Sequence, residues 1–289
     1  INDVEYTTAV QADGSWSVGI TAAQVSAWPA GAVNIAVSGE SSAGNPISIT
    51  HPVTVDLTPA AITINTIATD DVINAAEKGA NLTLSGTTTN VEAGQTVTVT
   101  FGGKNYTASV AGDGSWTATV PAADLAALPE GSASAQASVS NINGNSASAV
   151  HSYSVDSSAP TIIINTVASD NIVNASEADA GVTVSGSTTA EAGQIVTITL
   201  NSPTVQTYQA TVQADGSWSI NIPAADLAAL TDGSHTLTAT VNDKAGNPAS
   251  TTHNLAVDLT VPVLTINTIA GDDIINATEH GEALVLSGC

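Results

Sequence analysis

Apolar and polar residues alternate in short runs along the chain. Val97, Val99 and Phe101 are separated by single threonines, which is the period-two pattern of a strand with one buried face. Within residues 57–156 this pattern and the turn residues between the runs predict strands near 61–67, 82–86, 95–101, 105–111, 115–120, 132–140 and 147–155. Seven short strands in about 100 residues are typical of an immunoglobulin-like β-sandwich, so the sequence predicts an all-β fold.

The same pattern returns along the chain with offsets of 100 and then 102 residues. INTIATDDVINAAE at 64–77 reappears as INTVASDNIVNASE at 164–177 and as INTIAGDDIINATE at 266–279. The turn sequence DGSW keeps the same offsets, at 13–16, 113–116 and 215–218. Because unrelated markers hold one register, the sequence predicts tandem repeats of a single sandwich.

Three linkers mark the boundaries between the repeats. DLTPAA, DSSAP and DLTVP each begin with an aspartate and contain a proline but no glycine, so we expect them to be short and stiff. The predicted domains are a partial one at 1–56 with the last strands only, complete ones at 57–156 and 157–258, and a partial one at 259–289 with the first strands only. Stiff linkers predict that these immunoglobulin-like seven-strand sandwiches form a linear rod.

The two partial repeats allow two interpretations. In one, the chain is an arbitrary segment of a longer polymer. In the other, residues 259–289 of one copy pair with residues 1–56 of the next and cover strand edges that would otherwise stay exposed. Residues equivalent to 88–100 would still be missing from a domain completed in this way.

The charge balance excludes several classes of partner. Three lysines and no arginine face 26 acidic residues, for a formal net charge of −23. Such a surface repels phosphate groups, so we expect neither nucleic-acid binding nor binding to anionic lipid. No apolar run is long enough to cross a membrane. Cys289 is the only cysteine, so no disulfide forms within the chain.

No motif predicts catalysis. His51, His151 and His253 occupy one repeat-equivalent position, and a residue present in every unit is typical of a structural role. His235 and His280 are isolated and are expected to be exposed. No phosphate-binding loop, dinucleotide motif or nucleophile–histidine set is present, so the sequence predicts a protein that is not an enzyme. Trp116 and Trp218 each follow a turn and are predicted to anchor the core of a repeat.

Acidic residues recur in the loop after the first strand. In a sandwich this loop lies at the pole where the last strand ends, which brings Asp70, Asp71 and Glu77 near Asp156 and the start of the next domain. Asp243, in the loop before the last strand of that domain, should face the same junction. Crowded carboxylates suit a hard cation with oxygen ligands, and Ca²⁺ is the expected one. The predicted ligands over all repeats are Asp56, Asp70, Asp71, Glu77, Asp156, Asp170, Glu177, Asp243, Asp258, Asp272, Asp273 and Glu279.

A purely structural role is the alternative for part of this set. Residues 74–77, 174–177 and 276–279 each match N-x-x-E, the pattern of a capping box for one helical turn. Asp13, Asp113 and Asp215 in DGSW are interpreted as turn formers, and Asp124 and Asp226 as parts of short helical turns.

With these motifs the chain resembles, over its whole length, the bacterial Ig-like repeats of giant adhesins and biofilm-associated proteins exported by type I secretion. The resemblance rests on the linkers, on INTIATDDVINAAE, DGSWT and PAADLAAL, and on the DKAGN loop at 243–247. It implies a secreted, cell-surface stalk in which calcium stiffens the junctions between neighbouring repeats, while regions outside this chain bind the host or surface ligand. The ligand roles that it implies fall on Asp70, Asp71, Glu77, Asp156, Asp170, Glu177 and Asp258.

The sequence departs from the family pattern at two places. Asn171 replaces the second loop aspartate, and SNINGNSA at 140–147 stands where the next repeat has DKAGN. The junction at Asp56 is therefore expected to bind calcium more weakly. A second functional hypothesis is that the repeats themselves bind a glycan or a host ligand. Trp28, which replaces the leucine of the other repeats, is the aromatic residue that would favour it.

Overall fold

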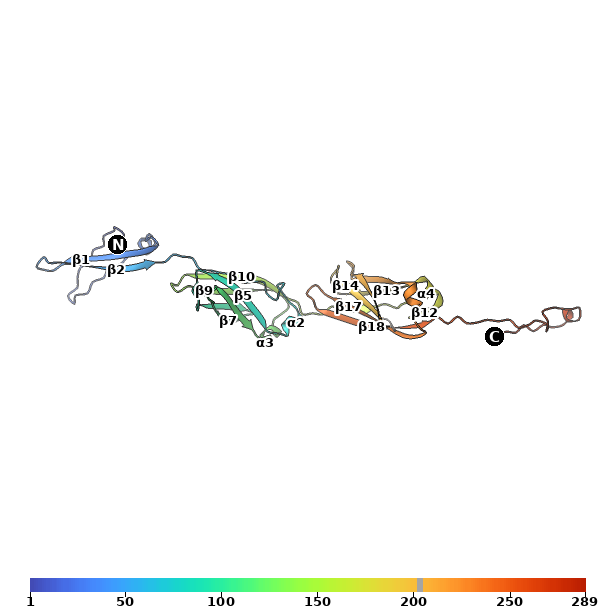
Figure 1. The fold of residues 1–289 in the computed structure, drawn as a ribbon. Coiled ribbons are helices and arrows are strands. Elements are labelled where there is room, and N and C mark those ends of the chain that lie inside the picture. Colours follow the sequence, from blue (N-terminus) through green and yellow to red (C-terminus); the bar gives the residue numbers. More distant parts are fainter. Residues whose placement is uncertain (202–204) are drawn as a thin grey trace. The chain divides into compact units, whose positions relative to one another are not determined.

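The computed structural model describes residues 1–201 and 205–289 (Figure 1). The described chain divides into two compact units. The first consists of residues 1–73 and 77–155, and the second of residues 74–76 and 156–289.

The first unit contains a sandwich of two sheets around a hydrophobic core. One sheet has the strand order β3-β5-β8, and the other has the order β4-β10-β9-β6-β7. Neighbouring strands are antiparallel, except that β4 runs parallel to β10. The strands are β3 (Ala61–Ile62), β4 (Val72–Ile73), β5 (Leu82–Thr89), β6 (Thr96–Phe101), β7 (Lys104–Ser109), β8 (Ser115–Val120), β9 (Gly131–Ser140) and β10 (Ser146–Val155).

The second unit repeats this topology among its described residues, as the green and orange parts of Figure 1 show. Its sheets have the orders β11-β13-β16 and β12-β18-β17-β14-β15, and β12 is parallel to β18. The strands are β11 (Ile162–Ile164), β12 (Ile172–Asn174), β13 (Val182–Thr188), β14 (Ile195–Asn201), β15 (Gln206–Thr211), β16 (Ser217–Ile222), β17 (Gly233–Asn242) and β18 (Pro248–Asp258). The predicted all-β sandwich fold is confirmed.

Only the start of the first predicted strand, 61–67, is a regular strand, β3. Ile62 pairs with Thr88 of β5, and irregular hydrogen bonds to β5 continue as far as Asn65. The chain then crosses the core at Ile67, which is 1% exposed, and pairs through Val72–Ile73 with β10. Alternation of apolar residues does not reveal such a crossing, because the buried face changes sheets without losing its apolar character. β3 therefore corresponds to the first of the seven predicted strands, and β4, which follows the acidic loop, was not predicted.

The predicted tryptophan anchors are confirmed. Trp116 and Trp218 are each 1% exposed. Each ring packs against a glycine of the neighbouring strand in the same sheet, Gly86 for Trp116 and Gly186 for Trp218. Their indole N–H groups are buried without a hydrogen-bond partner in the described chain. An unpaired buried donor costs about 1–3 kcal/mol. The apolar area that each ring buries therefore outweighs the cost of its unpaired N–H group.

Short helices fill the loops. They are α1 (Ala22–Val25), α2 (Ala75–Lys78), α3 (Ala122–Ala126), α4 (Ala175–Ala180), α5 (Ala224–Leu227) and the 3₁₀ turn η1 (Glu279–Gly281). Asp124 and Asp226 lie in α3 and α5, as predicted, and each accepts a hydrogen bond from a tyrosine hydroxyl, of Tyr106 and Tyr208 respectively. Among the described residues, no helix is long and apolar enough to span a membrane.

The terminal segments have little regular structure. Residues 1–56 contain the antiparallel pair β1 (Gly31–Glu40) and β2 (Pro46–Val55), and residues 259–289 contain a single bridge, between Ile266 and Gly288, in the described chain.

The two isolated histidines differ in their burial. His280 is exposed, as expected. The expectation for His235 was wrong: it is 7% exposed, and its Nε2 lies 2.8 Å from the carbonyl oxygen of Thr231. His235 lies on the side of β17 whose alternating residues are buried, and its Nε2 is hydrogen-bonded to a main-chain carbonyl.

The glycine under each tryptophan yields the first prediction. A Cβ on Gly86 would lie 1.9 Å from the carbonyl oxygen of Thr63 and 2.7 Å from Cζ2 of Trp116, and Gly186 is equally crowded. Because the main-chain carbonyls beside these glycines cannot move away easily from an added methyl group, G86A and G186A should each lower the free energy of unfolding by at least about 1–3 kcal/mol. The control is G112A, where a Cβ meets nothing within 4 Å. Urea unfolding followed by tryptophan fluorescence measures the difference, and equal midpoints for G86A and G112A would contradict it.

Candidate calcium-binding junctions

The loop after the first strand is closed by the side chain at its second acidic position. Asp71 Oδ1 accepts the N–H of Ile67 at 2.8 Å and lies 2.7 Å from Nε2 of His151 on β10. These bonds hold a tight loop in which Ala68, Thr69 and Asp71 all have positive φ. The Ile67 N–H, and then His151, hold the pKa of Asp71 below its usual value.

The second complete repeat closes the same loop with an amide. Asn171 Oδ1 accepts the N–H of Val167 at 2.9 Å and lies 2.7 Å from Nε2 of His253. In the C-terminal segment, Asp273 Oδ1 accepts the N–H of Ile269 at 2.8 Å. The position therefore needs an oxygen acceptor rather than a charge. This explains both the Asn171 departure and the histidine present in every repeat.

The first acidic position of the loop is exposed to solvent. In each case Oδ1 accepts the N–H two residues further on, which forms an Asx turn. The distances are 3.0 Å for Asp70 and Val72, 2.9 Å for Asp170 and Ile172, and 3.0 Å for Asp272 and Ile274. These carboxylates thus face outward on a loop whose backbone is fixed.

The glutamates of the N-x-x-E pattern take part in capping. Asn174 and Glu177 form both hydrogen bonds of a capping box at the start of α4, each at 3.1 Å. Asn276 and Glu279 form the same pair of bonds, at 3.0 and 3.1 Å. Glu77 lies in α2. The capping interpretation is confirmed at Glu177 and Glu279, and their service as metal ligands stays a prediction.

The linker aspartates form Asx turns of their own. Oδ1 accepts the N–H two residues further on, at 2.9 Å from Thr58 to Asp56, 3.3 Å from Ser158 to Asp156, and 3.2 Å from Thr260 to Asp258.

The first linker is also held by two asparagines of the following repeat. Asn143 Nδ2 donates to Asp56 Oδ2, and Asn145 Nδ2 donates to the carbonyl oxygens of Asp56 and Thr58, both at 3.2 Å. Hydrogen bonds from Thr58 and then Asn143 lower the pKa of Asp56.

The loop before β18 holds the second linker in the same manner. Asn247, 1% exposed, donates from Nδ2 to the carbonyl oxygen of Asp156 and to Asp243 Oδ2, both at 2.9 Å. Its N–H donates to Asp243 Oδ1 at 2.8 Å, and its Oδ1 accepts the N–H of Ala75 at 2.8 Å. In the first unit Asn141 occupies the place of Asp243 and accepts the N–H groups of residues 143 and 145.

The predicted ligands are only partly brought together. Within the second unit, Asn247 connects the main chain of Asp156 to the side chain of Asp243. Asp70, Asp71 and Glu77 belong to the first unit, so their clustering with Asp156 stays a prediction. Over residues 1–201 and 205–289, no group of three or more Asp, Glu, His or Cys side chains stands ready to hold a metal. The available donors are nevertheless carboxylate, amide and carbonyl oxygens, which suit Ca²⁺.

Side chains at two repeat positions form hydrogen bonds to the linkers and were missed by sequence reasoning. Asn145 and Asn247 follow a glycine at the same repeat position, and Asn45 in the first segment does too, so the repeat offered a signal. Asp232 accepts hydrogen bonds from the last linker. Its equivalents in the earlier repeats are Glu130 and Ala30, so no shared residue marked the position.

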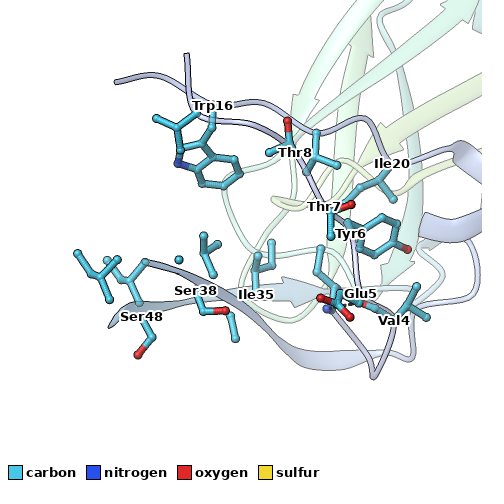
Figure 2. Close-up of a pocket in the computed structure, with 18 of the residues that line it drawn as sticks. Val4, Glu5, Tyr6, Thr7, Thr8, Trp16, Ile20, Ile35, Ser38 and Ser48 are labelled. Carbon is cyan, nitrogen blue, oxygen red and sulfur yellow. Dashed lines mark hydrogen bonds between the residues drawn. The ribbon is translucent and has the colours of Figure 1, made fainter. Parts of the chain in front are cut away.

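The N-terminal segment carries a hollow of about 950 Å³. Figure 2 shows Tyr6, Trp16, Ile20 and Ile35 among the side chains that line it. Trp16 is 48% exposed, whereas its equivalents Trp116 and Trp218 are each 1% exposed. The hollow is thus the open half of a sandwich core.

Closure of the loop by Asp71 gives a second prediction. With EDTA present, D71N should leave the urea midpoint of unfolding unchanged, because the amide of Asn171 makes the same bonds in the next repeat. D71A should lower the midpoint, because the N–H of Ile67 and the ring of His151 lose their acceptor. The D70N variant, at an exposed neighbour, keeps an oxygen acceptor for the N–H of Val72 and controls for loss of charge. Equal effects of D71N and D71A would mean that the carboxylate itself is required.

Comparisons with known proteins identify the family. A bacterial Ig-like domain matches residues 159–259. None of the curated proteins matches the chain. Among solved structures, a Ca²⁺-stabilized adhesin that helps an Antarctic bacterium reach out and bind ice is 35% identical, over 98% of this chain and 70% of that one, with a TM-score of 0.49.

Two further solved structures also come from large adhesins. A 1.5-MDa bacterial ice-binding adhesin is 33% identical, over 90% of this chain and 85% of that one, with a TM-score of 0.48. A tetra-tandem repeat from the extending region of a large adhesion protein is 27% identical, over 96% and 68%, with a TM-score of 0.36. On the sequence identity of the first two, and on the family match, the chain belongs to the bacterial Ig-like domain family, as a run of adhesin repeats.

Proposed function

We propose that this chain is a spacer in a secreted bacterial surface adhesin, a stalk of repeats that is stiffened by calcium at its junctions and performs no catalysis. The observation that carries the proposal is the attachment of the first two linker aspartates, Asp56 and Asp156, to the repeat that follows each of them. Asn145 binds the main chain of Asp56, and Asn247 binds that of Asp156. A linker held in this way by its neighbour favours a rod over a flexible string, and a rod suits adhesion or biofilm formation at a distance from the cell.

Calcium would complete these joints. Asp156 Oδ1 accepts the N–H of Ser158 at 3.3 Å, and Asp70 is exposed on a fixed loop, so both can turn oxygens toward a cation. Asp243 is 8% exposed, and a cation would offset the cost of burying its charge. We extend the ligand role, on the chemistry of the carboxylate group, to Glu77 at this junction and to Asp170, Asp258, Asp272 and Asp273 at the next. Extracellular modules of this kind bind Ca²⁺ with a Kd of about 10⁻⁴–10⁻³ M.

A ligand-binding role for the repeats themselves has less support. Glycan-binding surfaces commonly use exposed aromatic rings, but Trp116 and Trp218 are buried, Trp28 is half-buried, and the exposed Trp16 occupies the core position of its own repeat. The hydroxyls of Tyr106 and Tyr208 are bound to aspartates. We therefore assign recognition of the host or surface ligand to parts of the adhesin outside this chain.

Calcium should stabilise the protein measurably. For the Kd range above, about 10 mM Ca²⁺ adds about 1.4–2.7 kcal/mol per site to the free energy of unfolding, because the ion binds only the folded state. Calorimetry should show a higher Tm with calcium than with EDTA, and small-angle scattering should show a longer, stiffer particle. D156N should lose the part of the response that comes from its own junction. D113N, which removes one charge from a DGSW turn, should keep it. An identical Tm and scattering profile with and without calcium would contradict the proposal.

The open half-cores at the two ends support a second proposal, head-to-tail self-association. Leu264, Ile275 and Leu286 in the C-terminal segment are 87%, 52% and 67% exposed. The equivalent side chains of the complete repeats are at most 8% exposed; they are Ile62, Ile73, Leu84, Ile162, Val173 and Val184. We propose that residues 259–289 of one copy pack into the hollow of residues 1–49 of another, as β3, β4 and β5 pack against the later strands of a complete repeat.

This association can be tested by light scattering over a concentration series, with a reducing agent to exclude disulfide dimers through the exposed Cys289. The mass of the wild-type chain should rise with concentration, and L264D or L286D should keep it monomeric. V263D is the matched control, because its equivalents Ala61 and Thr161 are exposed in the complete repeats. A monomeric wild-type chain at every concentration, or equal effects of V263D and L264D, would refute the association.

A further inference from the structure

The linker that leaves the second complete repeat is held by a residue of that same repeat. Asp232 lies in the turn between α5 and β17. Its Oδ1 accepts the N–H of Leu259 at 2.6 Å, and its Oδ2 accepts the hydroxyl of Thr260 at 2.5 Å. Both oxygens of one carboxylate therefore bind consecutive linker residues, and hydrogen bonds to a charged acceptor are the stronger kind.

The side chain of the linker is docked at the same place. Leu259 is half-buried and packs against the hydrophobic core of the second unit. The N–H of Thr260 is bound by Asp258 at 3.2 Å, so both linker N–H groups after the last strand are satisfied by aspartates. Leu259 is thus fixed through its main chain and its side chain together.

The earlier repeats differ at these positions. Leu57, the equivalent of Leu259, is 64% exposed, and Ala30 stands at the position of Asp232. In the first complete repeat the equivalent acid, Glu130, forms an ion pair with Lys78 at 3.3 Å. The aspartate and the docked leucine therefore occur together in the second complete repeat.

We propose that Asp232 is a positioning residue that clamps the start of the linker and fixes its direction of exit without a metal ion. A linker ordered in advance loses less conformational freedom when the junction binds its cation, so the clamp would favour calcium binding at Asp258. That consequence rests on the proposed spacer function, whereas the clamp itself does not. Hydrogen bonds from Thr260 and then from Leu259 hold the pKa of Asp232 below its usual value.

Amide hydrogen exchange of the full chain, measured residue by residue by NMR with EDTA present, tests the clamp. The Leu259 amide should be protected in the wild-type chain. D232A should speed its exchange by about tenfold or more, the effect of losing one hydrogen bond to a charged group. D232N keeps an oxygen acceptor and should retain part of the protection. D179A, which removes an exposed aspartate from α4, should change nothing.

Two results would overturn the clamp. One is free exchange of the Leu259 amide in the wild-type chain with EDTA. The other is protection that appears only after calcium is added, which would make Asp232 a metal ligand instead. The clamp is judged by exchange of the Leu259 amide with EDTA present, whereas the spacer proposal is judged by the response of Tm to calcium. Failure of the one is therefore distinct from failure of the other.

Discussion

Hydrogen bonds from short polar side chains to the main chain of loops and linkers are the interaction on which the proposed function depends. The sandwiches themselves are stabilised by apolar burial around Trp116 and Trp218. A stalk, however, is only as stiff as the segments between its domains. Here each linker aspartate accepts an N–H of its own linker, and Asn145 and Asn247 bind main-chain carbonyls of the first two linkers. Without glycine in the linkers, few such bonds are enough to restrict them.

The repeat register made much of the fold predictable. Offsets shared by unrelated markers located the repeats, and alternation located most strands of each sandwich, because buried and exposed faces change with period two. The crossing of the first strand from β5 to β10 was not predictable, since both sheets bury apolar side chains equally well. The burial of His235 was missed for a related reason: its partner is a main-chain carbonyl, which leaves no trace in the sequence.

The candidate site was predicted by position better than by role. Acidic residues do recur where the loops were expected, yet Asp71 and Glu177 make bonds that close a loop and cap a helix. Asp71 and Asn171 show why the two roles look alike in a sequence: an oxygen acceptor is what the loop requires, and either residue supplies it. The pairing of Asp71 with His151 joins residues far apart in the chain, so spacing alone could not reveal it.

The exchange of amide for carboxylate also implies that the junctions differ in their need for a cation. Asn141 and Asp243 occupy equivalent, buried positions in the loop before the last strand, 5% and 8% exposed. Asn141 carries no charge, so its loop is satisfied by hydrogen bonds alone. Asp243 carries a charge that two donors of Asn247 offset only in part, and burial makes the remainder costly. A cation beside Asp243 would therefore contribute more than one beside Asn141, so a chain with a single sandwich fold can combine joints that hold without metal and joints that depend on it.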